Sequence, residues 1–242
     1  MPPKIFAGKT DTGLKRENNE DVFSLSPEED FCLAADGMGG AAAGEVASKI
    51  FAETALEIFS DNTHRSEKEI LYRVQKAYRI ANEKILEHVT QHPSHRGMGC
   101  TAELLAFFDE GFILGHSGES RTYRLRDGQL EQLTQDHTLV QQQLQEGLIS
   151  PDQAKNHPMR NVIFRAVGVK KELTIDLLDG KFYPEDLFLL CSDGLTDMIQ
   201  DDQIQDILCA DIDLNQKAED LIESAKVAGG TDNITVVLAA IT

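Results

Sequence analysis

Four aspartates lie at the ends of strand-like segments, where their carboxylates could be brought together. Asp36 directly follows one apolar run and Asp21 directly precedes another. If these two runs form an antiparallel hairpin in which Val22 pairs with Ala35, Asp21 faces Asp36 just beyond the ladder. The spacing therefore predicts two carboxylates at one end of a sheet.

A second pair of aspartates has the same arrangement later in the chain. Asp193 comes just after the apolar segment 187–191, and Asp232 comes just before the apolar segment 234–241. The end of one strand adjoins the start of the next when the two strands are antiparallel. Both pairs of carboxylates could therefore line a single cleft.

Carboxylates packed this closely repel one another or take up protons, unless a cation lies between them. Mg²⁺ and Mn²⁺ are hard cations that prefer oxygen ligands, so the sequence predicts a divalent metal site. An aspartate beside glycine or asparagine is by itself more often a turn residue, and the metal interpretation depends on four of them sharing one kind of strand end. Nearby glycines let the backbone turn and bring a carbonyl oxygen close to an ion; they are Gly37, Gly39, Gly40 and Gly194.

The elements expected to position these aspartates are short strands and long amphipathic helices. Strand-like segments run over 22–26, 31–35, 98–108, 112–117, 122–126, 187–191 and 234–241. Apolar spacing predicts helices over 41–59, 70–89, 204–209 and 216–227, and a further helix that begins at Ser150-Pro151. Because strands and helix pairs follow one another without regular alternation, we expect an α+β fold with mostly antiparallel sheets. The last two strand segments are almost wholly apolar, which predicts central strands.

Composition narrows the class of protein. The 242 residues carry 41 acidic and 23 basic side chains, a net charge of −18, which disfavours nucleic-acid binding because phosphate backbones are held by basic surface. No linker divides the chain, so we expect one domain over 1–242. No apolar stretch is long enough to cross a bilayer and no signal-peptide core follows the N-terminus, which predicts a cytoplasmic protein without membrane contact. The cysteines lack metal-site spacing, and we expect Cys32, Cys100 and Cys191 to be buried free thiols.

An ordered set of motifs resembles the PPM, or PP2C-type, protein phosphatases, and the resemblance covers nearly the whole chain. The form Asp-Gly-Met-Gly-Gly and the compact length are similar to the bacterial branch of that family. The matching segments are Arg16-Glu17-Asn18-Asn19-Glu20-Asp21, Ala35-Asp36-Gly37-Met38-Gly39-Gly40, Met98-Gly99-Cys100-Thr101, His116-Ser117-Gly118-Glu119-Ser120-Arg121, Thr134-Gln135-Asp136-His137-Thr138, His157-Pro158-Met159-Arg160-Asn161, Cys191-Ser192-Asp193-Gly194-Leu195 and Gly230-Thr231-Asp232-Asn233-Ile234-Thr235.

The resemblance implies a β-sandwich of two antiparallel sheets flanked by helix pairs, a four-layer αββα arrangement, with the metals at one end. It implies that Asp36 bridges two Mn²⁺ or Mg²⁺ ions and that the carbonyl of Gly37 binds one of them. Asp193 and Asp232 would bind the other ion. The segment 135–171 corresponds to a mobile flap beside the active site, which is thought to influence substrate choice.

The remaining site residues implied by the resemblance surround this pair of ions. Asp21 and Glu20 would hold metal-bound waters, and Arg16 would bind the substrate phosphate through its planar guanidinium. The alternative for Arg16 is a surface ion pair with Glu17 or Glu20. Glu119 stands where the family usually has an aspartate that helps to hold a third, weaker metal, so we expect its third-metal affinity to differ.

Two further positions depart from the family pattern. Met38 replaces a histidine that many eukaryotic members have as a proposed general acid, which leaves metal-bound water as the expected source of the leaving-group proton. Cys100 replaces a common threonine or serine, and we interpret it as a packing variation.

The implied activity is metal-dependent hydrolysis of phosphoserine and phosphothreonine in proteins. A water shared by two cations loses its proton near neutral pH, and the ions stabilise the transferring phosphoryl group. The expected partners are phosphorylated substrates of a bacterial Ser/Thr kinase, with the enzyme acting as a monomer. Two alternatives are a pseudophosphatase that binds without turnover and a hydrolase of small phosphoesters.

Histidine and cysteine side chains invite other catalytic roles, which we do not assign. His116 lies in a predicted strand, where a satisfied core residue is the ordinary interpretation. His137 and His157 lie in the flap, where we expect capping and loop hydrogen bonds. Cys191 lies in an apolar strand, and the sequence lacks the C-x5-R loop of cysteine phosphatases.

Overall fold

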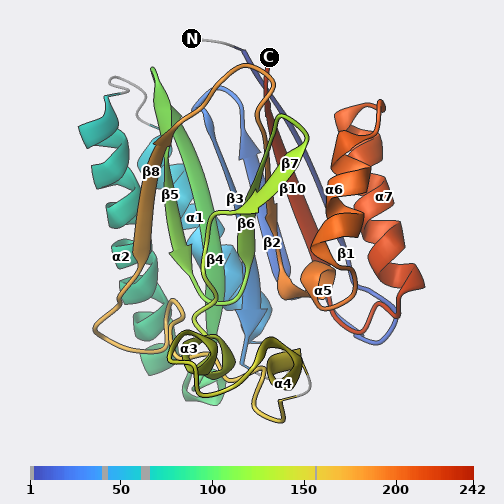
Figure 1. The fold of residues 1–242 in the computed structure, drawn as a ribbon. Helices are drawn as coiled ribbons and strands as arrows, with labels where there is room; N and C mark the ends of the chain where they lie inside the picture. The colour runs from blue at the N-terminus through green and yellow to red at the C-terminus, as the bar shows by residue number, and fades with distance from the viewer. Residues whose placement is uncertain (1–2, 40–42, 61–65, 156) are drawn as a thin grey trace.

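The computed structural model describes residues 3–39, 43–60, 66–155 and 157–242, which form two packed five-stranded sheets with helices on their outer faces (Figure 1). Every pairing between neighbouring strands is antiparallel. The predicted β-sandwich with flanking helix pairs is therefore confirmed. Gly40, in one of the motifs, and Ala41, at the predicted start of a helix, lie outside the described residues.

The first sheet has the strand order β2-β3-β4-β5-β8 and carries one of the two aspartate pairs. The second sheet has the order β1-β10-β9-β6-β7, with the predicted central strands β9 and β10 in its interior. The strands of the first sheet are Asp21–Ser26 (β2), Phe31–Met38 (β3), Gly99–Phe108 (β4), Gly111–Ser117 (β5) and Asp176–Lys181 (β8). Those of the second are Lys4–Asp11 (β1), Arg121–Arg126 (β6), Gln129–Gln132 (β7), Leu187–Cys191 (β9) and Ile234–Ile241 (β10).

Helices cover the outer face of each sheet. Helices α1 (Gly44–Phe59) and α2 (Glu67–Gln91) pack on the first sheet, and α6 (Asp201–Cys209) and α7 (Leu214–Val227) pack on the second (Figure 1). Three short helices complete the fold: α3 (Leu139–Gln145), α4 (Pro151–Lys155) and α5 (Asp193–Thr196), with a 3-10 turn at Pro93–His95. The predicted helix start is confirmed, because Ser150 and Gln153 exchange the two hydrogen bonds of a capping box.

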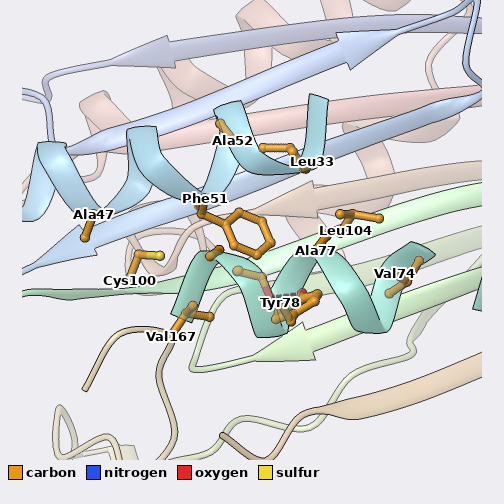
Figure 2. Packing of buried hydrophobic residues seen from close by; sticks show 14 of the residues in the cluster. Leu33, Ala47, Phe51, Ala52, Val74, Ala77, Tyr78, Cys100, Leu104 and Val167 are labelled. Atoms are coloured by element: carbon orange, nitrogen blue, oxygen red, sulfur yellow. Dashed lines mark hydrogen bonds between the residues drawn. The ribbon is translucent and has the colours of Figure 1, made fainter. Parts of the chain in front are cut away.

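The core consists of three layers of buried apolar side chains, one between the two sheets and one under the helices on each outer face. Phe107 and Phe188 meet edge to face between the two sheets, with ring centroids 5.7 Å apart. On the outer side of the first sheet, Phe51 of α1 packs against Tyr78 of α2 (Figure 2). The Tyr78 hydroxyl lies 2.7 Å from the carbonyl oxygen of Gly115, so its polar end is satisfied inside the core.

Properties expected from composition are found in the described residues. Cys32, Cys100 and Cys191 are buried free thiols, as predicted, and Cys209 is exposed. In the part of the chain that the structure describes, no helix has the length and apolar character needed to cross a membrane.

A buried ion pair links the sandwich to the segment that follows β7. Glu103 and His116 are fully buried on neighbouring strands, and the Glu103 carboxylate contacts His116 Nδ1. Thr122 Oγ1 donates to the second carboxylate oxygen at 2.6 Å, and His116 Nε2 donates to the carbonyl of Gln135 at 2.9 Å. Burial alone would lower the pKa of His116, but Glu103 and the Gln135 carbonyl outweigh it and raise that pKa. His116 is a satisfied core residue, as predicted.

Replacing Glu103 with glutamine is expected to lower the free energy of unfolding by about 2 kcal/mol, because a buried charge-assisted hydrogen bond becomes a neutral one. Chemical denaturation at neutral pH measures this change. The matched control is Glu110→Gln on the exposed turn after β4, which should change the same free energy by less than about 0.5 kcal/mol. Equal unfolding midpoints for the two variants would contradict the stabilising role of the pair.

Candidate metal centre

The first aspartate pair lies where the hairpin prediction placed it. Strand β2 pairs with β3 so that Val22 is opposite Ala35 and Asp21 is opposite Asp36. Strand β3 is longer than predicted and continues through Asp36 to Met38, because it also pairs with β4. The two carboxylates therefore face each other on the last rungs of a ladder.

The second pair is brought to the same end of the sandwich by β9 and β10. These strands are antiparallel neighbours, so the residues after β9 adjoin the residues before β10. Asp193 opens α5, which Figure 1 shows at the end of the sandwich where β3 finishes. Charges on Asp193 and Asp232 both raise the pKa of Asp36, which places the two pairs close enough to interact.

A cleft of about 360 Å³ opens over these carboxylates. It contains six of the eight residues that sequence analysis assigned to the site, and Asp21 and Asp193 lie beside it and interact with Asp36. The lining residues are Arg16, Glu17, Asn18, Glu20, Asp36, Gly37, Met38, Gly39, Thr101, Glu119, Ile163, Asp232 and Asn233.

Two carboxylate oxygens at this site are buried without a partner. Asp21 Oδ1 and Asp193 Oδ1 have almost no exposed area and accept no hydrogen bond. Leaving such atoms unpaired in the interior costs free energy, so a native structure needs a reason to keep them. The donor set consists of carboxylate and carbonyl oxygens, which is the chemistry that Mg²⁺ and Mn²⁺ require. The residues present therefore fit the predicted cations.

The pKa values show what the carboxylates do without a cation. Burial raises the pKa of Asp21 to about 6, and burial together with neighbouring aspartates raises that of Asp193 to about 7. Asp36 is raised well above its ordinary value, first by burial and then by the charges of Asp21, Asp193 and Asp232. Proton uptake thus offsets part of the repulsion between these carboxylates. Among the described residues, no group of three or more His, Cys, Asp and Glu side chains is arranged to hold a metal ion as it stands.

Arg16 supplies positive charge at the rim of the cleft. Its Nη2 donates to Asp232 Oδ2 at 2.6 Å, and the Arg16 side chain is about half exposed. The carboxylate that Arg16 contacts is therefore neither Glu17 nor Glu20, the two partners expected in the alternative. It is Asp232, which lies just before β10 and lines the same cleft. Glu20 contributes through space and helps to raise the pKa of Arg16.

The two glutamates assigned to the site also reach the cleft. Burial raises the pKa of Glu20, although nearby Arg16 opposes the shift. Burial and the charge of Asp193 raise the pKa of Glu119 to about 8. Glu119 is thus electrostatically part of the centre, between β5 and β6.

Two glycines are needed here for close packing and not for a left-handed turn. A Cβ on Gly194 would lie 1.9 Å from the carbonyl oxygen of Asn233, and a Cβ on Gly37 would lie 2.2 Å from that of Gly44. These contacts hold the start of α5 against β10 and the end of β3 against α1. Both glycines were expected to let the backbone turn and bring a carbonyl oxygen close to an ion.

Asn233 and Ser192 position the aspartates, and sequence reasoning assigned them no role. The Asn233 side chain donates to the carbonyl of Asn18 at 2.9 Å and accepts from the backbone N–H of Glu20 at 2.8 Å, which ties the Arg16 loop to β10. Ser192 Oγ donates to Asp21 Oδ2 at 2.8 Å, across the two sheets. Ser192 directly precedes Asp193 and Asn233 directly follows Asp232 in the family motifs. This adjacency is the sequence feature that could have indicated their roles.

The histidines of the flap make structural contacts, as expected. His137 is buried and its Nδ1 accepts from the backbone N–H of Gly118 at 3.1 Å. Burial and neighbouring His116 lower its pKa to about 4, so the ring is neutral. His157 Nδ1 accepts from the backbone N–H of Met159, which closes a loop.

Known proteins are similar to this chain in sequence and in fold. A family model described as Protein phosphatase 2C matches residues 15–234. The serine/threonine phosphatase stp of Listeria welshimeri is 36% identical over 234 residues, which cover 95% of this chain and 93% of that protein. The crystal structure of the Mycobacterium tuberculosis serine/threonine phosphatase PstP/Ppp has a TM-score of 0.92 at 37% identity, with 98% of each chain covered. The PstP catalytic domain in complex with two manganese ions has a TM-score of 0.89 at 37% identity and covers 98% of this chain and 97% of that one.

The family match covers both aspartate pairs and every strand of the first sheet, so it includes the parts of the chain that build the cleft. A solved structure that is 37% identical also agrees in fold over 98% of each chain. On these grounds the chain belongs to the protein phosphatase 2C family.

Proposed function

We propose that this protein hydrolyses phosphoserine and phosphothreonine in other proteins with the help of bound Mn²⁺ or Mg²⁺. The observation that carries the proposal is the pair of unpartnered carboxylate oxygens, Asp21 Oδ1 and Asp193 Oδ1, buried under an oxygen-lined cleft. The two manganese ions of the similar PstP domain support the choice of cation. The names of the relatives support the substrate class.

The residues proposed to hold two cations are those of the two strand-end pairs. Asp36 is the proposed bridging ligand with the carbonyl of Gly37 beside it, and Asp193 and Asp232 are the proposed ligands of the second ion. When bound, the cations lower the pKa of water and offset the charge of the phosphoryl oxygens. The chain itself brings these carboxylates to one end of the sandwich, where Asp21 and Asp36 are opposite each other on the β2–β3 ladder.

Asp21, Glu20 and Arg16 have supporting roles in the proposal. Asp21 and Glu20 would accept hydrogen bonds from the waters of the cations, and their raised pKa values are those of groups that lack that positive charge. Arg16 is free to turn from Asp232 toward a substrate phosphate, because its side chain is half exposed at the rim. Its guanidinium can donate two parallel hydrogen bonds to phosphate oxygens.

The proposal also covers the domain organisation and the cellular role of the protein. We assign residues 1–242 to one phosphatase domain and residues 135–171 to a flap, which is supported by the position of α3 and α4 beyond the end of the sheets (Figure 1). Ile163 of this segment lines the cleft. We further propose a monomeric, cytoplasmic enzyme that opposes a bacterial Ser/Thr kinase; the names and organisms of the relatives support the substrate class and the bacterial setting.

A turnover assay tests the function. Phosphate release from a phosphothreonine peptide is measured with and without Mn²⁺, for the natural protein and for Asp193→Ala. The proposal expects release that depends on Mn²⁺ and is lost in the variant. No metal-dependent release from the peptide would overturn it, and release from p-nitrophenyl phosphate alone would favour a hydrolase of small phosphoesters. Peptide binding without turnover would favour a pseudophosphatase.

Replacing Glu119 with aspartate is expected to lower the Mn²⁺ concentration that gives half-maximal activity by at least about threefold, because the shorter side chain restores the residue usual for a third-metal site. Activity is titrated with Mn²⁺ for both proteins. The control is Glu146→Asp on the exposed end of α3. Superimposable titration curves for Glu119→Asp and the natural protein would show that this position does not affect metal affinity.

A further inference from the structure

A second groove opens beside the cleft of the metal centre. Its volume is about 380 Å³, and it shares Met38 and Ile163 with the first cleft, so the two hollows adjoin at these side chains. The second groove, called here the flap groove, is formed mainly by the last part of the flap and the segment that leads to β8. Its lining residues are Met38, Ile163, Phe164, Arg165, Ala166, Val169, Lys170, Glu172, Leu173 and Thr174.

The chemistry of the flap groove differs from that of the cleft. The cleft is lined by five carboxylate side chains, whereas Glu172 is the one carboxylate that lines the groove. Large apolar side chains are exposed along it, with Phe164 at 39% and Val169 at 43% of their full area. Arg165 is held by Asp176 at 2.7 Å, so its charge is offset locally. Exposed apolar groups that gather in one depression mark a surface that binds an apolar partner.

Hydrogen bonds to the sandwich fix the walls of the groove. The backbone N–H of Phe164 donates to the carbonyl of His137 at 3.0 Å, and His137 is itself held against β5. On the other wall, Asn82 of α2 accepts from the backbone N–H of Gly168 at 2.7 Å and donates to the carbonyl of Lys170 at 3.0 Å. A groove with walls fixed in this way binds without a large ordering cost.

We propose that the flap groove binds an apolar side chain of the substrate polypeptide, close in sequence to the phosphorylated residue. The inference rests on the proposed function and deepens it. The occupant follows from position, because a chain whose phosphoresidue lies over the aspartates must leave the cleft, and the groove adjoins the cleft at Met38 and Ile163. It also follows from charge, since the groove offers apolar surface and Lys170 where the cleft offers carboxylates.

Matched phosphothreonine peptides test this preference. One set carries a single leucine that is moved through the three positions on each side of phosphothreonine, and the reference carries aspartate at the same positions. The kcat/KM of at least one leucine peptide should exceed that of its aspartate partner by about tenfold. Equal values at every position would overturn the proposal. If no peptide released phosphate in the presence of Mn²⁺, while p-nitrophenyl phosphate was also inert, the proposed function itself would fail.

Two substitutions of the same kind locate the preference. Val169→Asp places a carboxylate in the groove and should reduce the leucine-to-aspartate ratio of kcat/KM by about tenfold. Val162→Asp is the matched control, because Val162 lies on the same limb of the flap, is similarly exposed at 45%, and does not line the groove. A second groove variant, Phe164→Ala, removes contact area without adding charge. It keeps the test valid if Val169→Asp does not fold. A ratio changed equally by the Val162 and Val169 substitutions, or unchanged by both groove variants, would contradict the assignment.

Discussion

Replacing Asp36 with asparagine is expected to reduce phosphopeptide hydrolysis by at least about a thousandfold while making the metal-free protein more stable. The loss of activity follows because Asp36 faces Asp21 in register and interacts with Asp193 and Asp232, so the substitution removes the carboxylate that links the two pairs. The gain in stability follows because a buried carboxylate among like charges disfavours the folded state, and asparagine removes that charge. Steady-state kinetics with Mn²⁺ and thermal unfolding in EDTA measure the two effects.

Asp186→Asn is a control for which we expect the opposite changes in stability and activity. Asp186 is a buried aspartate directly before the first residue of β9, and its carboxylate is bound by both Arg126 Nε at 2.7 Å and Nη2 at 2.6 Å. Asp186→Asn should therefore lower the unfolding temperature and leave phosphopeptide hydrolysis intact. If Asp36→Asn lowered stability in EDTA as Asp186→Asn does, the carboxylate cluster would not be under the repulsion inferred here.

The same repulsion gives the metal-free protein a defined pH dependence. Asp21 and Asp193 have folded-state pKa values of about 6 and about 7, above their ordinary values. A carboxyl group with a raised pKa stabilises the folded state fully below its unfolded pKa and loses that contribution as pH rises through the folded pKa. These groups therefore make the protein less stable in EDTA at pH 8 than at pH 5, and Mn²⁺ should reverse the trend.

The interior strands and the edge strand β2 could be predicted from the sequence, whereas the other three edge strands could not. Strands β9 and β10 are buried on both faces and have continuous apolar sequences, so they could be predicted as strands. The strands that were missed, β1, β7 and β8, each lie at an edge of a sheet. An edge strand is covered less completely and carries charged side chains that discourage further pairing, so its apolar pattern is weak. The charged residues of β8 are an example, with Asp176, Asp179 and Lys181 in six residues.

The site was predictable where it depended on local register and not where it depended on contacts between loops. The opposition of Asp21 and Asp36 followed from the length of one hairpin, which sequence spacing fixes. The ion pair between Arg16 and Asp232 joins residues 216 positions apart, and no spacing rule reaches that distance. The role of Asn233 as the tie between two loops has the same origin, because its partners come from the other end of the chain.

The affinity for Mn²⁺ is expected to rise by about a hundredfold between pH 5.5 and pH 8. Cations bind the ionised carboxylates, so the protons held by Asp21 and Asp193 must leave first. With pKa values of about 6 and about 7, the ionised fraction of Asp21 rises about fourfold and that of Asp193 about thirtyfold over this range. The product of the two factors gives the expected change.

Calorimetric titration in two buffers with different heats of ionisation measures both the affinity and the protons released. At pH 6 we expect more than one proton to leave for each protein molecule that is filled with Mn²⁺, and at pH 8 we expect fewer, because Asp21 and Asp193 are then largely ionised. The control is Asp193→Asn, which keeps the fold of the cleft but lacks the group with the higher pKa. Any binding that remains in it should depend less steeply on pH. An affinity that is the same at pH 5.5 and pH 8 would mean that the carboxylates bind Mn²⁺ without giving up protons, and the buried oxygens Asp21 Oδ1 and Asp193 Oδ1 would then need another explanation.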